Sequence, residues 1–283
     1  MRVIENPATK MTLFERIGMD VGRSMAVEDA IRWSAANNVH FLDVQTDLAP
    51  NAMATMLPRA PAIRELCEQT GVALGLHTLS AVNVAEVSPF VTEAVDTYLR
   101  SYVDLAKAAG AGWVIVHAGN HFTADYQMRR EAGLERLKRT VGYAESQDVL
   151  LLLENTNREP EHAEVNYLCT TLEECLWYFD NLRSEHLGMA FTANHAHLYL
   201  EGVTGFVDAL DFTRCREVRL ADCHGTYEEH LNPGEGSMDF ADMFRRIEAK
   251  GFTGHYMNQF GTPDDMLEGR RYLVDVARKV GVV

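Results

Sequence analysis

The stretch Trp113-Val114-Ile115-Val116-His117 is a short apolar run that ends in a titratable side chain. Four more runs follow the same design: residues 74–76 before His77, 150–153 before Glu154, 187–191 before His195 and His197, and 218–220 before Asp222 and His224. Short, continuously apolar runs are typical of parallel strands that are buried on both faces. Because the carboxyl ends of parallel strands lie at the same edge of a sheet, the pattern predicts one shared polar site, as in an enzyme pocket.

Strand-like and helix-like segments alternate along the whole chain. We expect strands at residues 14–18, 41–45, 73–77, 113–117, 149–154, 187–192, 215–222 and 255–260. We expect helices at residues 27–36, 62–69, 91–109, 126–146, 172–181, 203–210, 240–249 and 266–280. This count predicts an α/β protein with a (β/α)8 TIM barrel. An open doubly wound sheet is the alternative, but residues 20–24 lack its GxGxxG phosphate loop.

Composition limits the domain organisation and the partners. The 283 residues show no linker or repeat, so we expect a single domain over residues 1–283. The net charge of -15 argues against a nucleic-acid partner, because binding to phosphates depends on Lys and Arg. No apolar stretch is long enough to span a membrane, and residues 1–10 lack the apolar core of a signal peptide. We therefore expect a cytoplasmic protein without a membrane partner.

Five segments carry a resemblance to a known family. They are LGLHTLSAVNVAEVSP from residue 74, WVIVHAGNH from 113, LLLENTN from 151, FTANHAH from 191 and VRLADCHGTYEEHLNPGEGSMDF from 218. Together they resemble the xylose isomerase-like TIM barrels, which include sugar phosphate isomerases and epimerases, inosose dehydratase-like proteins and endonuclease IV. The most specific piece is residues 230–236, which is similar to the H-x-x-x-G-x-G motif of that family. The resemblance implies an isomerase, epimerase or lyase with a site at the carboxyl ends of the strands.

The chain departs from the family at the usual metal ligands. The resemblance implies a divalent cation held by Glu, Asp, His and Glu, and these positions fall on Glu154, Thr192, Arg219 and Gln259. Three of the four residues are unsuited to a hard cation, which prefers anionic oxygen or neutral imidazole ligands. We therefore expect Arg219 to take the place of the ion and to pair with Glu154, which leaves donors either to polarise a substrate carbonyl or to bind a carboxylate.

A relocated metal stays open as a second interpretation. His77, His117 and Glu154 match three positions that hold one zinc ion in the nuclease branch of the family. His195, Glu228 and His230 match another zinc group of that branch. Two His and one Glu form a known catalytic zinc set, although the charge of a nearby Arg219 argues against an ion at Glu154.

Several further residues are candidates for the site, each with a simpler structural alternative. We expect Glu154 and one of His77, His117 and His197 to act as base and acid. Asp222 is a candidate catalytic residue, or a residue that caps the following loop or orients a histidine. The candidate substrate-binding residues are Arg158, His224, Gln259, Trp113 and Tyr256; the aromatic residues among them have core packing as the alternative, and Arg158 a surface ion pair.

These features favour an isomerase, epimerase or dehydratase that transfers a proton next to the carbonyl of a small polyhydroxylated compound. The expected partner is a small polyol, sugar or ring-bearing substrate. One alternative is a metal-dependent lyase or hydrolase that uses His77, His117 and Glu154. Another is a barrel that binds a sugar-like ligand without catalysis, because fold alone does not decide function. By analogy with similar barrels, a homo-oligomer is possible.

Overall fold

The computed structural model describes residues 11–282 of the chain. Residues 1–10, where no leader sequence was expected, and residue 283 lie outside this range. Eight parallel strands form a closed barrel in the order β1-β10-β9-β8-β6-β4-β3-β2. Their bounds are β1 Ile17–Asp20, β2 Phe41–Gln45, β3 Ala73–His77, β4 Trp113–Val116, β6 Leu151–Glu154, β8 Leu187–Thr192, β9 Cys215–Leu220 and β10 His255–Asn258. The chain is thus a single (β/α)8 barrel domain, as the alternation of segments predicts.

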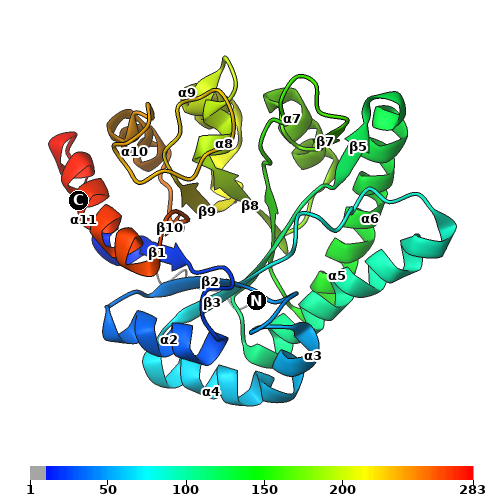
Figure 1. Ribbon diagram of the computed structural model, residues 1–283, viewed down its shortest axis with the longest axis horizontal. Helices are drawn as coiled ribbons and strands as arrows, with labels where there is room; N and C mark the ends of the chain where they lie inside the picture. Colours follow the sequence, from blue (N-terminus) through cyan, green and yellow to red (C-terminus); the bar gives the residue numbers. More distant parts are fainter. Residues whose placement is uncertain (1–10, 283) are drawn as a thin grey trace.

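Helices surround the strands (Figure 1). The longer ones are α2 Val27–Ala36, α4 Ala60–Thr70, α5 Pro89–Ala109, α6 Tyr126–Gln147, α7 Leu172–Asn181, α9 Gly202–Ala209, α10 Phe240–Ala249 and α11 Pro263–Lys279. Shorter helical segments are α1 Leu13–Arg16, α3 Met53–Met56, α8 Ala193–His197 and the 3-10 turns Leu57–Arg59, Thr123–Asp125 and Phe212–Arg214. No helix among the described residues is long and apolar enough to cross a membrane.

The predicted segments agree with the structure to within three residues at each end, but the first strand begins three residues later than expected, after a helical turn. Residues 13–16 form the short helix α1, and β1 begins only at Ile17. The Thr12 hydroxyl accepts a hydrogen bond from the backbone N–H of Glu15 at 3.3 Å, and the Glu15 carboxylate accepts one from the Thr12 N–H at 2.7 Å. This capping box stabilises a helical turn where the apolar residues suggested a strand.

Three short elements near the site were not predicted. Strands β5 (Asn120–Phe122) and β7 (Val165–Tyr167) pair antiparallel outside the barrel. Helix α8 follows β8 directly and carries His195. All three elements are only three to five residues long, too short for hydrophobic periodicity to indicate them.

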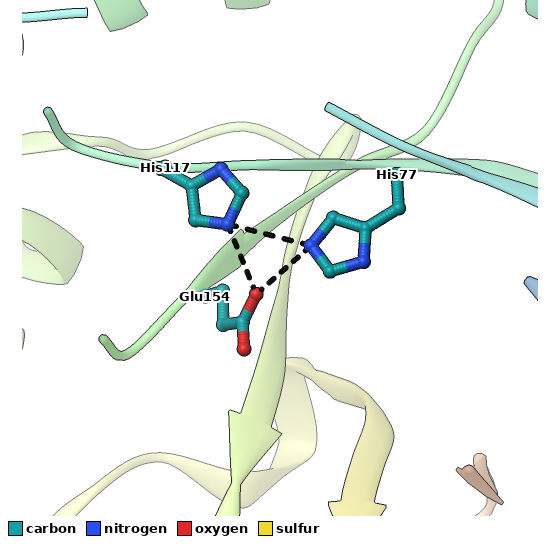
Figure 2. A group of neighbouring side chains, drawn as sticks. All are labelled: His77, His117 and Glu154. Atoms are coloured by element: carbon teal, nitrogen blue, oxygen red, sulfur yellow. Dashed lines mark hydrogen bonds and ion pairs between the residues drawn. The ribbon is translucent and has the colours of Figure 1, made fainter. Parts of the chain in front are cut away.

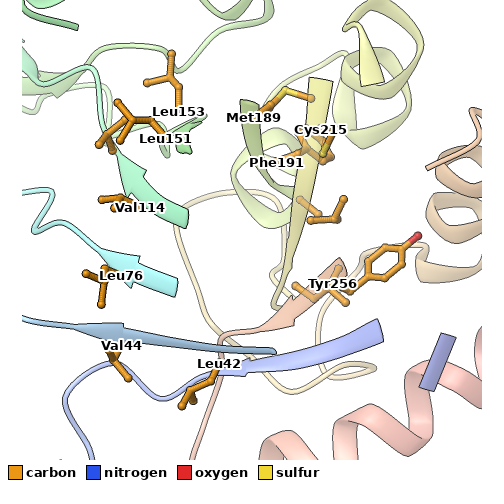
Figure 3. Packing of buried hydrophobic residues seen from close by; sticks show 14 of the residues in the cluster. Leu42, Val44, Leu76, Val114, Leu151, Leu153, Met189, Phe191, Cys215 and Tyr256 are labelled. Atoms are coloured by element: carbon orange, nitrogen blue, oxygen red, sulfur yellow. The ribbon is translucent and has the colours of Figure 1, made fainter. Parts of the chain in front are cut away.

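The outer faces of the barrel strands pack against the helices. Figure 3 shows side chains such as Leu42, Val44, Leu76 and Val114 in this layer, and all four are at most 1% exposed. Successive side chains along a strand point to opposite faces. The alternate residues of β2, Phe41, Asp43 and Gln45, therefore face the barrel interior.

The barrel interior changes from apolar to polar along the strands. A small apolar cluster contains Phe41, Trp113 and Met257, and Asp43 lies two residues further along β2 than Phe41. The Trp113 indole donates a hydrogen bond to Asp43 at 3.0 Å. A Cβ at Gly75 would clash with both of these side chains, so glycine is required there. Gln45, at the end of β2, lines a cavity.

Candidate functional site

The cavity lies at the carboxyl ends of the barrel strands and has a volume of about 130 Å³. It is lined by Gln45, His77, Thr78, Ser80, His117, Glu154, Thr156, Asn157, Tyr167, His195, Glu228, His230 and Gln259. A larger hollow of about 210 Å³ lies elsewhere, lined by residues of α7, β8, α9 and the segments that follow α7 and α9. We place the candidate site in the smaller cavity because the lining of the larger one contains no histidine and because sites of this fold lie at the carboxyl end.

Three side chains from neighbouring strand ends meet at the cavity. His77 ends β3, His117 follows β4 and Glu154 ends β6. The Nε2 atoms of His77 and His117 lie 3.3 and 3.2 Å from Oε2 of Glu154, and 3.4 Å from each other (Figure 2). We call this group the buried triad, because each member is less than 9% exposed. The sequence pattern predicted that these three residues meet, and they do.

Each member of the buried triad also contacts a further polar residue. Nδ1 of His77 lies 3.5 Å from Oδ2 of Asp20, and Nδ1 of His117 lies 3.2 Å from Oγ1 of Thr78. Burial and Arg219 act to lower the pKa of His77, but hydrogen bonds with Asp20 and Glu154 outweigh them and raise it to about 9. Desolvation by burial lowers the pKa of His117.

Glu154 is ionised in this environment. Its Oε1 atom accepts a hydrogen bond from the Thr192 hydroxyl at 2.5 Å. Burial alone would raise the pKa of Glu154, but hydrogen bonds from His117 and His77 and the charge of Arg219 hold it well below its usual range. One carboxylate oxygen and two imidazoles are therefore turned toward the same point.

Arg219 lies in the barrel interior and is fully buried. Its guanidinium donates to Asp43 at 2.7 Å, to Glu217 at 2.6 Å and to Asp20. Its Nε donates to Gln259 at 2.9 Å. We call Arg219, Asp20, Asp43 and Glu217 the arginine cluster. The N–H groups of Arg219 are already used in hydrogen bonds to these carboxylates and to Gln259. The expectation that Arg219 polarises a substrate carbonyl is therefore wrong.

The carboxylates of the arginine cluster differ in their charge. Burial opposes ionisation of Asp20, but Arg219 and His77 lower the pKa of Asp20 to about 2. Burial and the neighbouring Glu217 raise the pKa of Asp43 well above its usual range. Burial likewise raises the pKa of Glu217. Asp20 is thus the carboxylate of the cluster that remains most firmly ionised.

A second set of three titratable residues lines the same cavity. Oε1 of Glu228 lies 3.1 Å from Nε2 of His195 and 3.0 Å from Nε2 of His230. We call these residues the loop triad, because Glu228 and His230 lie in the loop between β9 and α10. Although burial opposes it, the hydrogen bonds from His195 and His230 lower the pKa of Glu228 to about 2. Hydrogen bonds with Glu228 and Gln259 raise the pKa of His230 against the effect of burial.

Asp222 anchors the loop that carries the loop triad. Its carboxylate accepts hydrogen bonds from the backbone N–H groups of Cys223, Gly234 and Met238 at 2.9, 2.8 and 3.1 Å. It is 1% exposed. These contacts match the loop-capping alternative for Asp222 and correct its assignment as a catalytic residue.

Two aromatic candidates lie away from the cavity. Trp113 packs against His255 with ring centroids 4.5 Å apart, at the apolar end of the barrel interior. Tyr256 is fully buried, and its hydroxyl donates to Glu248 at 2.6 Å. The prediction that Trp113 and Tyr256 contact substrate is therefore wrong. Both side chains are used in packing and in hydrogen bonds to buried or partly buried carboxylates.

Three polar candidates also lie outside the described lining of the cavity. Arg158 is exposed on the loop after β6. His224 is exposed and its Nδ1 lies 2.9 Å from Oε2 of Glu229. His197 contacts the Ser237 hydroxyl at 2.9 Å from the far end of α8. Their assignments as site residues are corrected, because one helical turn or a few loop residues direct each side chain away from the strand ends. Gln259, in contrast, lines the cavity.

The sequence reasoning missed Asp20, Asp43 and Glu217. Asp20 ends β1, two residues beyond the end predicted for the first strand, and so did not stand out as a strand-end carboxylate. Asp43 and Glu217 interrupt the apolar strands FLDVQ and CREVRL. A charged residue inside a barrel strand is the signal that could have found them, because buried charges require a partner of opposite sign.

The fold and the cavity define a (β/α)8 barrel with a histidine- and carboxylate-rich site. The chain matches the family described as xylose isomerase-like TIM barrel over residues 32–276, and it belongs to that family. Among curated proteins, a probable endonuclease 4 of Methanoculleus marisnigri is 30% identical over 153 residues. That match spans 49% of this chain and 52% of the relative, about half of its length.

Solved structures of sugar epimerases share the fold. A D-tagatose 3-epimerase-like protein superposes with a TM-score of 0.80 at 19% identity, over 94% of this chain and 98% of that one. D-psicose 3-epimerase from Clostridium cellulolyticum H10 gives 0.73 at 13% identity, over 94% and 99%. The 3-keto-D-glucoside 4-epimerase from E. coli gives 0.71 at 14% identity, over 93% and 99%.

The usual metal position of the family does not fit this chain. Nε of Arg219 lies 3.7 Å from Glu154 and 2.9 Å from Gln259, so a cation already occupies the space between these residues. The buried triad does fit a metal, because its three ligand atoms converge and are borderline nitrogen and oxygen donors. The carboxylates around Arg219 offset its charge, so its repulsion of an ion is weaker than the sequence alone suggested.

Proposed function

We propose that the protein is a metal-assisted isomerase or epimerase of a small polyhydroxylated carbonyl compound. It acts by proton transfer at the carbon next to the carbonyl. The observation that carries this proposal is that the buried triad and the loop triad line the same cavity. One triad supplies metal ligands and the other supplies groups that exchange protons, which are the two requirements of this reaction.

The buried triad is the metal-binding half of the site. His77 and His117 would bind a zinc-like ion through Nε2 and Glu154 through Oε2, while Thr192 holds the other oxygen of Glu154. When bound, such an ion polarises a carbonyl and stabilises the negative charge that develops as the adjacent proton leaves. His77 and His117 would thereby replace the usual ligands lost at residues 192, 219 and 259, and Glu154 would be kept.

The loop triad is the proton-transfer half. The pKa of His230 is raised by its hydrogen bond with Glu228, which favours the protonated imidazole and holds the ring in place. His230 and Glu228 are partly exposed to the cavity, with side chains 42% and 36% accessible. His230 would donate a proton to the substrate, and the ionised Glu228 beside it would accept the proton from the carbon, because both oxygens of Glu154 are already engaged.

The lining suits an uncharged, hydroxyl-rich substrate. Gln45, Asn157 and Gln259 contribute amides and Ser80 and Tyr167 contribute hydroxyl groups, all of which hydrogen-bond sugar hydroxyls. Among the described residues of the lining there is no Lys or Arg to hold a phosphate or carboxylate. The sugar epimerases among the structural relatives support a sugar substrate. Three expectations stay predictions: that the protein does not bind nucleic acid, that it self-associates and that it is cytoplasmic.

Solvent-hydrogen exchange tests the proposal. Zinc-loaded protein is incubated in D2O with a panel of ketoses, aldoses and ketocyclitols, and loss of the proton next to the carbonyl is followed by NMR. We expect exchange with at least one compound and a decrease of about 10³-fold for Glu154→Gln, the scale of a lost acid–base or metal-binding group. Glu161→Gln, on the exposed loop after β6, is the matched control and keeps the wild-type rate. Equal exchange by Glu154→Gln refutes the assignment.

A metal-dependent lyase or hydrolase is the second candidate. The convergence of two imidazoles and one carboxylate favours it, because this ligand set also serves zinc hydrolases. Metal-dependent cleavage of small esters or phosphodiesters, without any carbon–hydrogen exchange, would establish this alternative. Binding of a polyol without exchange or cleavage would instead identify a barrel that only binds its ligand.

A further inference from the structure

His77 differs from His117 in what faces its second ring nitrogen. Nδ1 of His117 faces the neutral hydroxyl of Thr78, whereas Nδ1 of His77 faces two charged groups. These are the carboxylate of Asp20 at 3.5 Å and the guanidinium of Arg219 at 3.4 Å. The guanidinium can only donate a hydrogen bond and the carboxylate can only accept one. The two neighbours therefore favour opposite tautomers of the neutral His77 imidazole, which is the form that binds a metal once the second proton has left.

Metal binding requires one of these tautomers. If Nδ1 carries the proton, it donates to Asp20 and leaves the Nε2 lone pair directed at Glu154 and His117. If Nδ1 instead accepts from Arg219, the proton lies on Nε2 and blocks the ligand position. A carboxylate behind a ligand histidine fixes the first arrangement, and its removal usually weakens metal binding.

Asp20 is itself held firmly at the end of β1. Its Oδ1 accepts the backbone N–H of Gly22 at 2.8 Å, and its Oδ2 accepts from Arg219. Its side chain is 11% accessible. One N–H group of the guanidinium therefore donates to Asp20. This contact holds the carboxylate where it can accept a hydrogen bond from Nδ1 of His77.

We propose that Asp20 is a positioning residue: held by Arg219, its carboxylate accepts the Nδ1 proton of His77 and directs Nε2 toward the other two members of the buried triad. This inference rests on the metal-binding part of the proposed function. The arginine cluster would then do more than balance buried charge. Through Asp20 it would set the tautomer of His77, which lies two strands away in the barrel.

Zinc affinity of the metal-free protein tests the inference, measured by competition with a chromophoric chelator. We expect Asp20→Asn to lower zinc affinity by about 10- to 100-fold, because an amide oxygen accepts the Nδ1 proton of His77 less strongly than the carboxylate does, so that Nδ1 can accept from Arg219 and the proton lies on Nε2. The visible absorption of the cobalt form should weaken in parallel. Asp43→Asn is the matched control: Asp43 shares Arg219 but makes no hydrogen bond to His77 among the described contacts. It should keep affinity within about threefold of wild type, since purely structural effects are small beside a lost ligand-orienting contact.

The outcomes separate the two proposals. A wild-type protein that binds no zinc refutes the metal site and with it both proposals. A wild-type protein that binds zinc, with equal affinity in Asp20→Asn, refutes only the role of Asp20. Equal losses in Asp20→Asn and Asp43→Asn also refute it, because they indicate a general effect of the arginine cluster. If Asp20→Asn does not fold, Asp20→Ser removes the same acceptor charge with a smaller side chain and carries the same expectation.

Discussion

The buried triad and the loop triad contain the same types of side chain but are built in different ways. Each member of the buried triad lies at the end of a barrel strand and has a further polar contact behind it. Two members of the loop triad lie between β9 and α10, and the carboxylate of Asp222 anchors that loop. Their side chains are partly exposed, whereas those of the buried triad are not.

This difference assigns the two groups to different tasks. Metal ligands must keep a fixed geometry, which strand ends and contacts behind the ligands provide. A group that exchanges protons with a substrate must be reached by that substrate and by water, which a loop position allows. The barrel strands therefore hold the metal-binding side chains rigidly, whereas the loop exposes the proton-exchanging side chains to substrate. If this division is correct, substitutions in the barrel interior should change stability more than substitutions in the loop triad.

Removal of Arg219 should have the largest effect. Arg219→Met leaves Asp20, Asp43 and Glu217 facing one another in a buried space without their cation. We expect a loss of about 3–5 kcal/mol in the free energy of unfolding, typical of a broken buried ion pair. Urea denaturation at neutral pH measures it, and Arg245→Met, at an exposed i,i+3 ion pair, is the control. A loss below about 1 kcal/mol would mean that the cluster does not stabilise the barrel.

The second-largest effect should be a pH dependence of the free energy of unfolding of the metal-free protein, caused by His77 of the buried triad. The pKa of His77 is raised to about 9, so the folded state binds this proton more tightly than the unfolded state does. The stabilisation is therefore complete below about pH 6.5 and disappears as the pH rises through about 9, on the order of 3 kcal/mol in total. Urea denaturation across this range checks it. The curve of His77→Gln should be flatter, and parallel curves for both proteins would contradict the prediction.

Much of the fold could be predicted from the sequence because each barrel strand is buried on both faces. Continuous apolar runs such as 73–77 and 187–192 mark such strands directly, and these two match the structure residue for residue. The first strand failed because Thr12 and Glu15 form a capping box inside an apolar stretch. Local hydrogen bonding there outweighs the hydrophobic pattern, and a pattern of apolar residues does not report it.

The residue pattern alone predicted the candidate site only where a strand places a side chain, whereas the loop triad was expected from the family resemblance. His77, His117 and Glu154 follow from strand ends, since the topology alone brings such positions together. The directions of Arg158, His197 and His224 depend on loops and on a short helix, which carry no periodic signal. Prediction of the arginine cluster would have required knowing which side chains of β2 and β9 point into the barrel. That depends on the register of the closed barrel.

The smallest effect on stability should come from the loop triad. His230→Gln removes a partly exposed imidazole whose contacts are to Glu228 and a backbone carbonyl, so we expect a change within about 0.5 kcal/mol. The same substitution should slow the exchange reaction by about 10²-fold or more, because it removes the proposed proton donor while the buried triad is intact. His224→Gln is the matched control, since this exposed histidine of the same loop contacts Glu229 outside the cavity and should alter neither quantity. A strongly destabilised His230→Gln protein would place the loop triad among the structural groups and remove the division between the two triads.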